Sequence, residues 1–263
     1  MTLDVPDTTM RQERLFDLGC RNADGQTVEK PAVTAIWSDF LPDTDGFPRL
    51  FRVLPPGATG PPSPMTYYAD SANPYDTCDT IEELLATGDG RCGEFQELMY
   101  YVLQVQGIAS TQKGVYAPNG AAGGVAAAKA DYLATYGVDP DTIYPHPSQI
   151  RDVFFVKNWT LSTAARWTVT DLTGVPGQGN ADAIGIFGDH ALIEYDGEIY
   201  DPSYGTGPFA SILAWEDASI DGFGVQFIKA PPFAVDFKFW TRKLDTKGTK
   251  EVTPYLTNNY KKS

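Results

Sequence analysis

The chain has 263 residues and a mass of 28.7 kDa, which is long for one compact domain and short for two full ones. Hydrophobic residues make up 42% of it, enough to build a core, so the composition excludes global disorder. The formal net charge is -14, because 34 Asp and Glu stand against 20 Lys and Arg. Such an acidic body repels nucleic acid, and no nucleic-acid partner is expected.

The compartment is inferred from signals that the sequence lacks. The N-terminal residues show no basic segment followed by an apolar run, so a cytoplasmic location is expected, with signal-less export left open. No apolar stretch reaches the length of a bilayer span, so no membrane partner is expected. The three cysteines, Cys20, Cys78 and Cys92, are too few and too scattered for a disulfide framework, which favours a reducing compartment.

Residues 1–64 are expected to form an N-terminal wrapping segment rather than a folded unit. The first 30 residues are polar and are predicted to be irregular or peripheral, and the stretch from Pro42 to Pro64 is dense in proline and glycine. Within that stretch, residues 49–54 form one short apolar run that is compatible with a strand. The remainder, 65–263, is expected to be one domain with an insertion at about 117–150.

Two helices are predicted after Thr80. The segment IEELLATG is typical of a short helix with Gly88 just past its end. A longer amphipathic helix of about four turns is predicted to begin at or just after Cys92 and to end before Gly107, because apolar residues recur there at three- and four-residue steps. Its apolar face consists of Phe95, Leu98, Met99, Val102 and Val105.

The rest of the chain changes in character twice. Inside the insertion, residues 117–124 are predicted to be a loop and residues 125–137 a helix that ends at Gly137. After Arg151 the hydrophobic period becomes two, which predicts short strands of a largely antiparallel sheet. The strand segments are 152–159, 165–172, 183–195, 198–204, 222–228 and 233–240. Helices followed by strands indicate the α+β class.

A histidine and an aspartate are predicted to face each other across a hairpin. The chain has only two histidines, and His146 lies between two prolines in a predicted loop. His190 opens the run HALIEY, which passes through Asp196-Gly197, a strong two-residue hairpin signal, into EIYDPSY. This register puts His190 and Asp201 on one face as diagonal neighbours, with Cβ atoms about 7 Å apart. A carboxylate in that place can fix the imidazole tautomer and stabilise the imidazolium.

Cys92 is the candidate nucleophile. It lies at the start of the amphipathic helix between Gly90 and Gly93, where the partial positive charge of the helix end stabilises a thiolate. An imidazole within reach would make a thiolate–imidazolium pair favourable. The N–H groups of the first helical turn, that of Gly93 among them, are candidate oxyanion donors, and Tyr68 and Asn73 upstream are further candidates. No spacing of His and Cys fits a metal site, so no metal or cofactor is expected.

The segments GRCGEFQELMYYVLQVQGI and DHALIEYDGEIYDPSYG resemble the transglutaminase-like superfamily of papain-type cysteine enzymes, and GRCGEF resembles the corresponding motif of peptide N-glycanases. The resemblance covers 80–108 and 182–205, about a fifth of the chain. It implies a papain/transglutaminase-like core in which the nucleophile helix packs on a mainly antiparallel sheet, so that 65–263 is the catalytic domain. It also implies Cys92 as nucleophile, His190 as general base and then acid, and Asp201 as the group that orients the imidazole.

The implied function is thiol-dependent acyl transfer, or amide or peptide hydrolysis, through a thioester. A protease, a deamidase and a transferase all remain open, and the substrate is expected to be a protein, a peptide or a small amide. The oligomeric state is left open. The alternative is a non-catalytic binding or structural module that retains the fold, which Leu192 favours because an aromatic residue is usual at this place in the family. The insertion is expected to restrict entry to the cleft.

Overall fold

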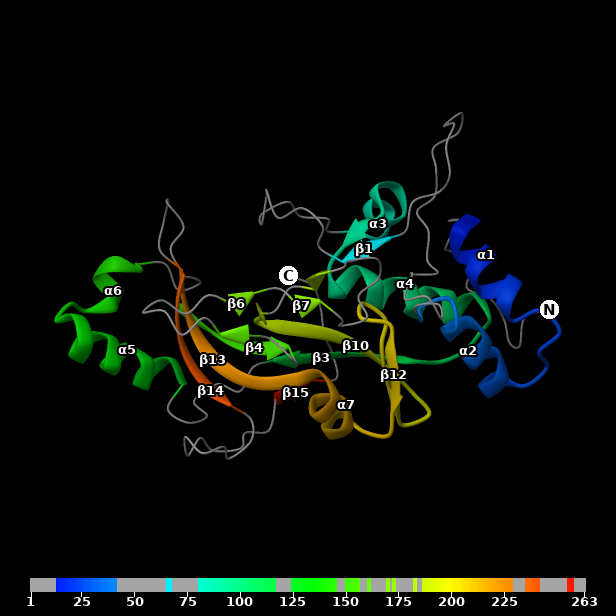
Figure 1. Cartoon of the computed structure of the whole chain (residues 1–263). Coiled ribbons are helices and arrows are strands. Elements are labelled where there is room, and N and C mark those ends of the chain that lie inside the picture. The colour runs from blue at the N-terminus through cyan, green and yellow to red at the C-terminus, as the bar shows by residue number, and fades with distance from the viewer. Residues whose placement is uncertain are drawn as a thin grey trace.

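The computed structural model describes residues 13–41, 65–67, 80–116, 124–145, 150–156, 160–161, 169–170, 172–173, 182–183, 186–228, 235–241 and 255–257. This part of the chain combines helices with antiparallel sheets, which confirms the predicted α+β class (Figure 1). None of the helices within these ranges has both the length and the apolar character needed to cross a membrane.

Two helices lie in the described N-terminal region, α1 (Glu13–Asn22) and α2 (Glu29–Trp37), so the prediction that the first 30 residues are irregular or peripheral is wrong for Glu13–Asn22. The reason is that α1 is amphipathic: Leu15 and Leu18 are three residues apart and both are buried in the main core. The helix lies so close to helix α4 that a Cβ atom on Gly19 would come within 2.9 Å of Val102 O. The proline-rich stretch, including residues 49–54, lies outside the described residues.

The two helices predicted after Thr80 are confirmed as α3 (Ile81–Thr87) and α4 (Cys92–Val105). The Thr80 side chain caps α3 by accepting a hydrogen bond from Glu83 N at 3.2 Å, and Gly88 ends it in the left-handed conformation with φ of 80°. Gly107 follows α4 with φ of 74°. The predicted apolar face of α4 is fully buried in the main core.

The helix α4 packs on a five-stranded antiparallel sheet whose strand order is β12-β11-β10-β3-β15. Its strands are β3 (Thr111–Tyr116), β10 (Asp189–Tyr195), β11 (Glu198–Asp201), β12 (Thr206–Phe209) and β15 (Tyr255–Thr257). The main core lies between α4 and this sheet and also includes α1, α2 and α3. Strand β3, which pairs with both β10 and β15, is absent from the strands predicted from sequence.

A second sheet has four strands in the order β14-β13-β4-β9, so the single predicted sheet is in fact divided. Its strands are β4 (Ile150–Val156), β9 (Ile186–Phe187), β13 (Ile220–Ile228) and β14 (Val235–Thr241). Strand β13 links the two halves, because Ile220 belongs to the main core and Val225 to a smaller one. Helix α7 (Ile212–Ser219) directly precedes β13.

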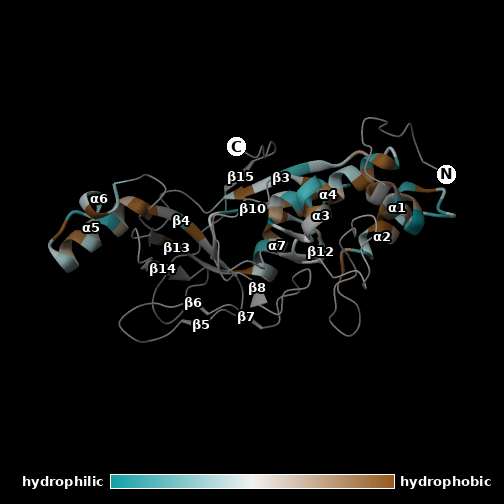
Figure 2. Ribbon diagram, turned by 90° about the horizontal axis from the view of Figure 1, so that it is seen from above, coloured by the Kyte–Doolittle hydropathy of each residue, from teal (hydrophilic) through white to brown (hydrophobic). Residues whose placement is uncertain are grey.

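The insertion folds onto this second sheet. Its helices α5 (Gly124–Tyr136) and α6 (Pro140–Ile143) build the smaller core from Ala128, Tyr144, Ile150 and Val225. Both views place α5 and α6 at one end of the molecule and α1 and α2 at the other (Figures 1 and 2). The helical part of the insertion therefore lies away from α4 and Cys92, contrary to the expectation that it covers a cleft there.

Three two-stranded pairs complete the described structure. Strand β1 (Thr66–Tyr67) runs parallel to β2 (Asp89–Gly90), directly before α4. The other two pairs are antiparallel: β5 (Thr160–Leu161) with β6 (Val169–Thr170), and β7 (Leu172–Thr173) with β8 (Asp182–Ala183).

Candidate active site

Cys92 is the first residue of α4, as predicted, and its side chain is 8% exposed. The helix start is held by Glu94, whose Oε2 accepts a hydrogen bond from Arg91 N at 2.7 Å. Gly93 is buried in the same first turn, where N–H groups have no acceptor within the helix. The thiol therefore lies beside a set of backbone donors that can stabilise negative charge.

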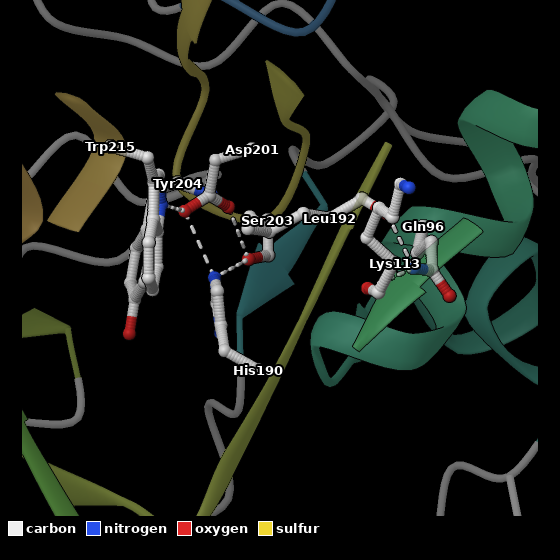
Figure 3. A network of polar contacts seen from close by, with 8 residues as sticks. All are labelled: Gln96, Lys113, His190, Leu192, Asp201, Ser203, Tyr204 and Trp215. Carbon is white, nitrogen blue, oxygen red and sulfur yellow. Dashed lines mark hydrogen bonds and ion pairs between the residues drawn. The ribbon is translucent and has the colours of Figure 1, made fainter. Parts of the chain in front are cut away.

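Gln96 ties this end of α4 to the sheet, one turn after Cys92. Its Nε2 donates to the backbone oxygens of Lys113 on β3, at 2.8 Å, and Leu192 on β10, at 2.5 Å (Figure 3). Because Leu192 is two residues from His190 on the same strand, these bonds hold the beginning of α4 against the strand that carries His190. Gln96 was not among the residues predicted from the sequence, although an amide at i+4 from the nucleophile, next to the apolar face of the helix, is a recognisable signal.

His190 and Asp201 meet as the hairpin register predicts. His190 Nε2 is hydrogen-bonded to Asp201 Oδ2 at 2.9 Å, and both side chains are fully buried (Figure 3). The register Tyr195↔Glu198 across the Asp196–Gly197 turn puts the two side chains on one face. On its other edge β10 pairs with β3, where Val115 lies opposite His190.

The carboxylate of Asp201 accepts four hydrogen bonds, two on each oxygen. Oδ2 accepts from His190 Nε2 and from Trp215 Nε1, both at 2.9 Å. Oδ1 accepts from Ser203 Oγ at 2.9 Å and from Tyr204 N at 3.2 Å. Ser203 Oγ also lies 3.4 Å from His190 Nε2. So many donors stabilise the charged carboxylate in a place that water does not reach.

The imidazole of His190 stacks on two aromatic rings. Tyr204 stacks on it with ring centroids 5.0 Å apart and an interplanar angle of 20°, and Trp215 stacks on it at 5.5 Å and 13°. A cation stacked on aromatic rings is stabilised by their electron density, so this stacking favours the imidazolium. Ser203, Tyr204 and Trp215 were not predicted as site residues. The available signal for the helix that carries Trp215 was Ser211, which caps α7 by accepting a hydrogen bond from Ala214 N at 3.1 Å.

The pKa of His190 depends on both other candidate residues, Asp201 and Cys92. Burial by itself lowers the pKa of His190, but the charge and hydrogen bond of Asp201 act against burial, followed by a hydrogen bond and a charge contribution from Cys92, so that the pKa is raised to about 10. Cys92 therefore lies within interaction range of the imidazole whose Nε2 faces Asp201. Cys92, His190 and Asp201 are brought together as the sequence predicts.

Most of the other residues singled out from the sequence are not described by the structure. Tyr68, Asn73, His146 and Cys78 lie outside the described residues, although β1, which ends one residue before Tyr68, runs beside Gly90. Cys20 lies at the contact of α1 and α4, where its Sγ is 3.4 Å from Gln106 Nε2. Across the described ranges, no group of three or more His, Cys, Asp or Glu side chains is placed to hold a metal ion.

Comparisons of the chain with models of protein families, with curated proteins and with solved structures find no match. The arrangement of Cys92, His190 and Asp201, with the side chains that hold them, is therefore the basis for a functional assignment.

Proposed function

We propose that the chain is a thiol-dependent enzyme of the transglutaminase-like class, acting by acyl transfer or by hydrolysis of an amide or peptide bond. Cys92 is the nucleophile, His190 the general acid and base, and Asp201 the residue that orients the imidazole. One observation carries the proposal: a single buried imidazole interacts with the carboxylate of Asp201 through Nε2 and also with the thiol at the start of α4.

The arrangement of the elements supports a papain/transglutaminase-like core. The residue at the N-terminus of α4 is the thiol, α4 packs on β10, and the His190 and Asp201 side chains come from adjacent antiparallel strands. These features agree with the nucleophile helix on an antiparallel sheet that the sequence resemblance implies. The order cysteine, histidine, aspartate along the chain agrees with the same motifs.

The chemistry follows from the positions of these groups. The Cys92 thiolate attacks the carbonyl carbon of a carboxamide or peptide, and the negative charge on its oxygen is stabilised by N–H groups of the first turn of α4. The imidazolium of His190 gives its proton to the departing amine, which leaves a thioester on Cys92. His190 then takes a proton from water or from an acceptor amine, whose attack on the thioester releases the product and restores the thiolate.

Alkylation with iodoacetamide at neutral pH, mapped by mass spectrometry, tests the activated thiol. Cys92 should react faster than Cys20 even though Cys20 is the more exposed of the two. In His190→Gln, which keeps a polar side chain of similar length, this preference should be lost. A Cys92 that reacts no faster than Cys20 in the native wild-type chain would show that the thiol is not activated.

The burial of the three side chains favours a second candidate, a non-catalytic module that retains the fold. His190 and Asp201 are fully buried and Cys92 is 8% exposed. A panel of glutamine peptides with an amine donor, together with general protease substrates, separates the two candidates. Turnover that disappears in Cys92→Ala supports the enzyme, whereas uniform inactivity with a Cys92 that resists alkylation supports the module.

A further inference from the structure

We propose that Trp215 is a positioning residue of this site, because its indole N–H shares one carboxylate oxygen of Asp201 with His190 and thereby limits how strongly the imidazole holds its proton. The inference deepens the proposed function and rests on it wherever turnover is concerned. The relationship among the three side chains can be measured whether or not the chain is an enzyme.

Trp215 and His190 share one carboxylate oxygen of Asp201. Trp215 Nε1 and His190 Nε2 both lie 2.9 Å from Asp201 Oδ2, and all three side chains are fully buried (Figure 3). Oδ1 is held at the same time by Ser203 Oγ and Tyr204 N. A carboxylate with directed donors on both oxygens cannot rotate without losing several hydrogen bonds, so Trp215 fixes the direction in which Oδ2 faces the imidazole.

Trp215 also stacks on the imidazole of His190. The same indole stacks on the imidazole at 5.5 Å and 13°, and Tyr204 stacks on it as well. Helix α7 holds the indole there, since Trp215 N donates to Ser211 O at 3.1 Å in its first turn. Trp215 thus contacts both members of the His190–Asp201 pair and limits the rotation of each.

The electrostatic consequence follows from what surrounds His190. Within the described part of the chain, the charged groups that act on His190 are Asp201 from β11 and Cys92 from α4. The phenol ring of Tyr204, the apolar Val115 of β3 and the neutral indole of Trp215 of α7 also lie against it. A hydrogen bond donated to Oδ2 draws negative charge away from the oxygen that binds the imidazolium. Without that donor Asp201 would hold the imidazolium more tightly. The proton would then pass less readily to a leaving amine.

The variant Trp215→Phe keeps an aromatic face and removes the donor. Titration of His190 by NMR is direct, because the chain has only two histidines and His146→Gln leaves one of them. We expect the midpoint of the His190 titration to rise by about one pH unit in Trp215→Phe, the size expected for one hydrogen bond to a charged group. The matched control is Trp37→Phe, which removes a buried indole N–H that donates to the neutral Gly207 O at 3.3 Å and should leave the titration unchanged.

A second replacement of Trp215 distinguishes the loss of the N–H donor from a folding defect. A benzothiophene analogue of tryptophan at position 215, with sulfur in place of the N–H, keeps the shape and the stacking, and it should give the same upward shift. A purely structural role would lower the unfolding temperature of Trp215→Phe and leave the midpoint where it is in the wild-type chain. An unchanged or lowered midpoint in the folded analogue would overturn the inference.

Enzyme kinetics and the reactivity of Cys92 test the proposed function separately from the role of Trp215. In Trp215→Phe the alkaline limb of kcat/KM should move upward together with the His190 midpoint, and kcat should fall at neutral pH. An unreactive Cys92 in a chain whose His190 midpoint still moves would refute the proposed function but not the role of Trp215. A reactive Cys92 with an unmoved midpoint would refute only the role of Trp215.

Discussion

His190 Nε2 meets Asp201 Oδ2 at 2.9 Å across a hairpin whose two-residue turn is Asp196–Gly197. Both turn residues have positive φ, 51° and 75°, as a type I′ turn requires, and Asp-Gly suits this conformation well. The turn length fixes the register, and a shift of one residue would send Asp201 to the opposite face of the sheet. The pairing of the imidazole with the carboxylate thus depends on a local turn signal.

Asp201→Asn should preserve the fold and lower kcat/KM by about 10³- to 10⁴-fold, because an amide cannot stabilise the imidazolium and can hold the wrong tautomer. The pKa of His190 should fall in this variant, since the charge and hydrogen bond of Asp201 are what raise it against the effect of burial. Steady-state kinetics and NMR titration of His190 measure the two effects in the same preparation.

Asp189→Asn is the matched control, because Asp189 is adjacent to His190 but points to the other face of β10. There it pairs with Tyr116 on β3, whose pKa is raised by burial and then by the charge of Asp189. The control should leave kcat/KM nearly unchanged. Loss of activity in Asp189→Asn together with an active Asp201→Asn would mean that the orienting acid has been wrongly assigned.

Gln96→Leu should slow the alkylation of Cys92 and destabilise the chain by about 1–3 kcal/mol, because it removes a donor from two buried carbonyl oxygens. These bonds hold α4 against β3 and β10, so their loss loosens the position of the thiol relative to His190. Urea denaturation gives the stability, and the alkylation rate of the folded variant gives the effect on the site.

Gln106→Leu is the control for Gln96→Leu, because it separates the loss of stability from the slower alkylation of Cys92. Gln106 is also buried on the C-terminal side of α4, and its Nε2 donates to Gly19 O at 2.8 Å, at the contact with α1. This variant should lose a similar amount of stability and keep the wild-type alkylation rate of Cys92. Equal slowing in both variants would show that the rate follows stability and not the bonds from Gln96 to the sheet.

The parts of the site that were predictable depend on local patterns. The three- and four-residue steps of α4, the Asp-Gly turn and the alternation along β10 each involve a few neighbouring residues, and together they place Cys92, His190 and Asp201. Gly88 and Gly107, each with positive φ next to a helix end, were predictable for the same reason.

The parts that were missed depend on contacts between distant segments. Strand β3 alternates weakly, since it contains Gln112, Lys113 and Gly114, and it exists because it pairs with β10 and β15 on its two edges. Trp215 reaches Asp201 because α7 packs against β12 and β13, which no local pattern around Trp215 indicates. The division into two sheets likewise follows from the path of β13 between the two cores.

The stability of the chain should decrease between about pH 6.5 and pH 10, on account of His190. The folded-state pKa of His190 is raised to about 10, above the value of about 6.5 in an unfolded chain, so its contribution is complete below pH 6.5 and is lost as the pH rises to 10. The free energy of unfolding should fall by at most about 1.4 kcal/mol per pH unit in this window. Urea denaturation of wild type and His190→Gln measures it, and equal slopes for the two chains would contradict the assignment.

Asp152 on β4 should oppose folding at neutral pH, and Asp152→Asn should therefore stabilise the chain. Asp152 is half-buried opposite the fully buried Val225, and burial raises its pKa to about 6. A carboxyl group whose folded-state pKa is raised contributes stability below its unfolded value near pH 4, and this contribution is lost as the pH rises through 6. With allowance for its partial exposure to water, the gain in Asp152→Asn should be about 1 kcal/mol at pH 7.5 and absent at pH 4.

Asp24→Asn, at an exposed position, is the control and should change stability at neither pH. Urea denaturation of both variants at the two pH values decides the matter, because a gain that persists at pH 4 would have a cause other than the buried charge.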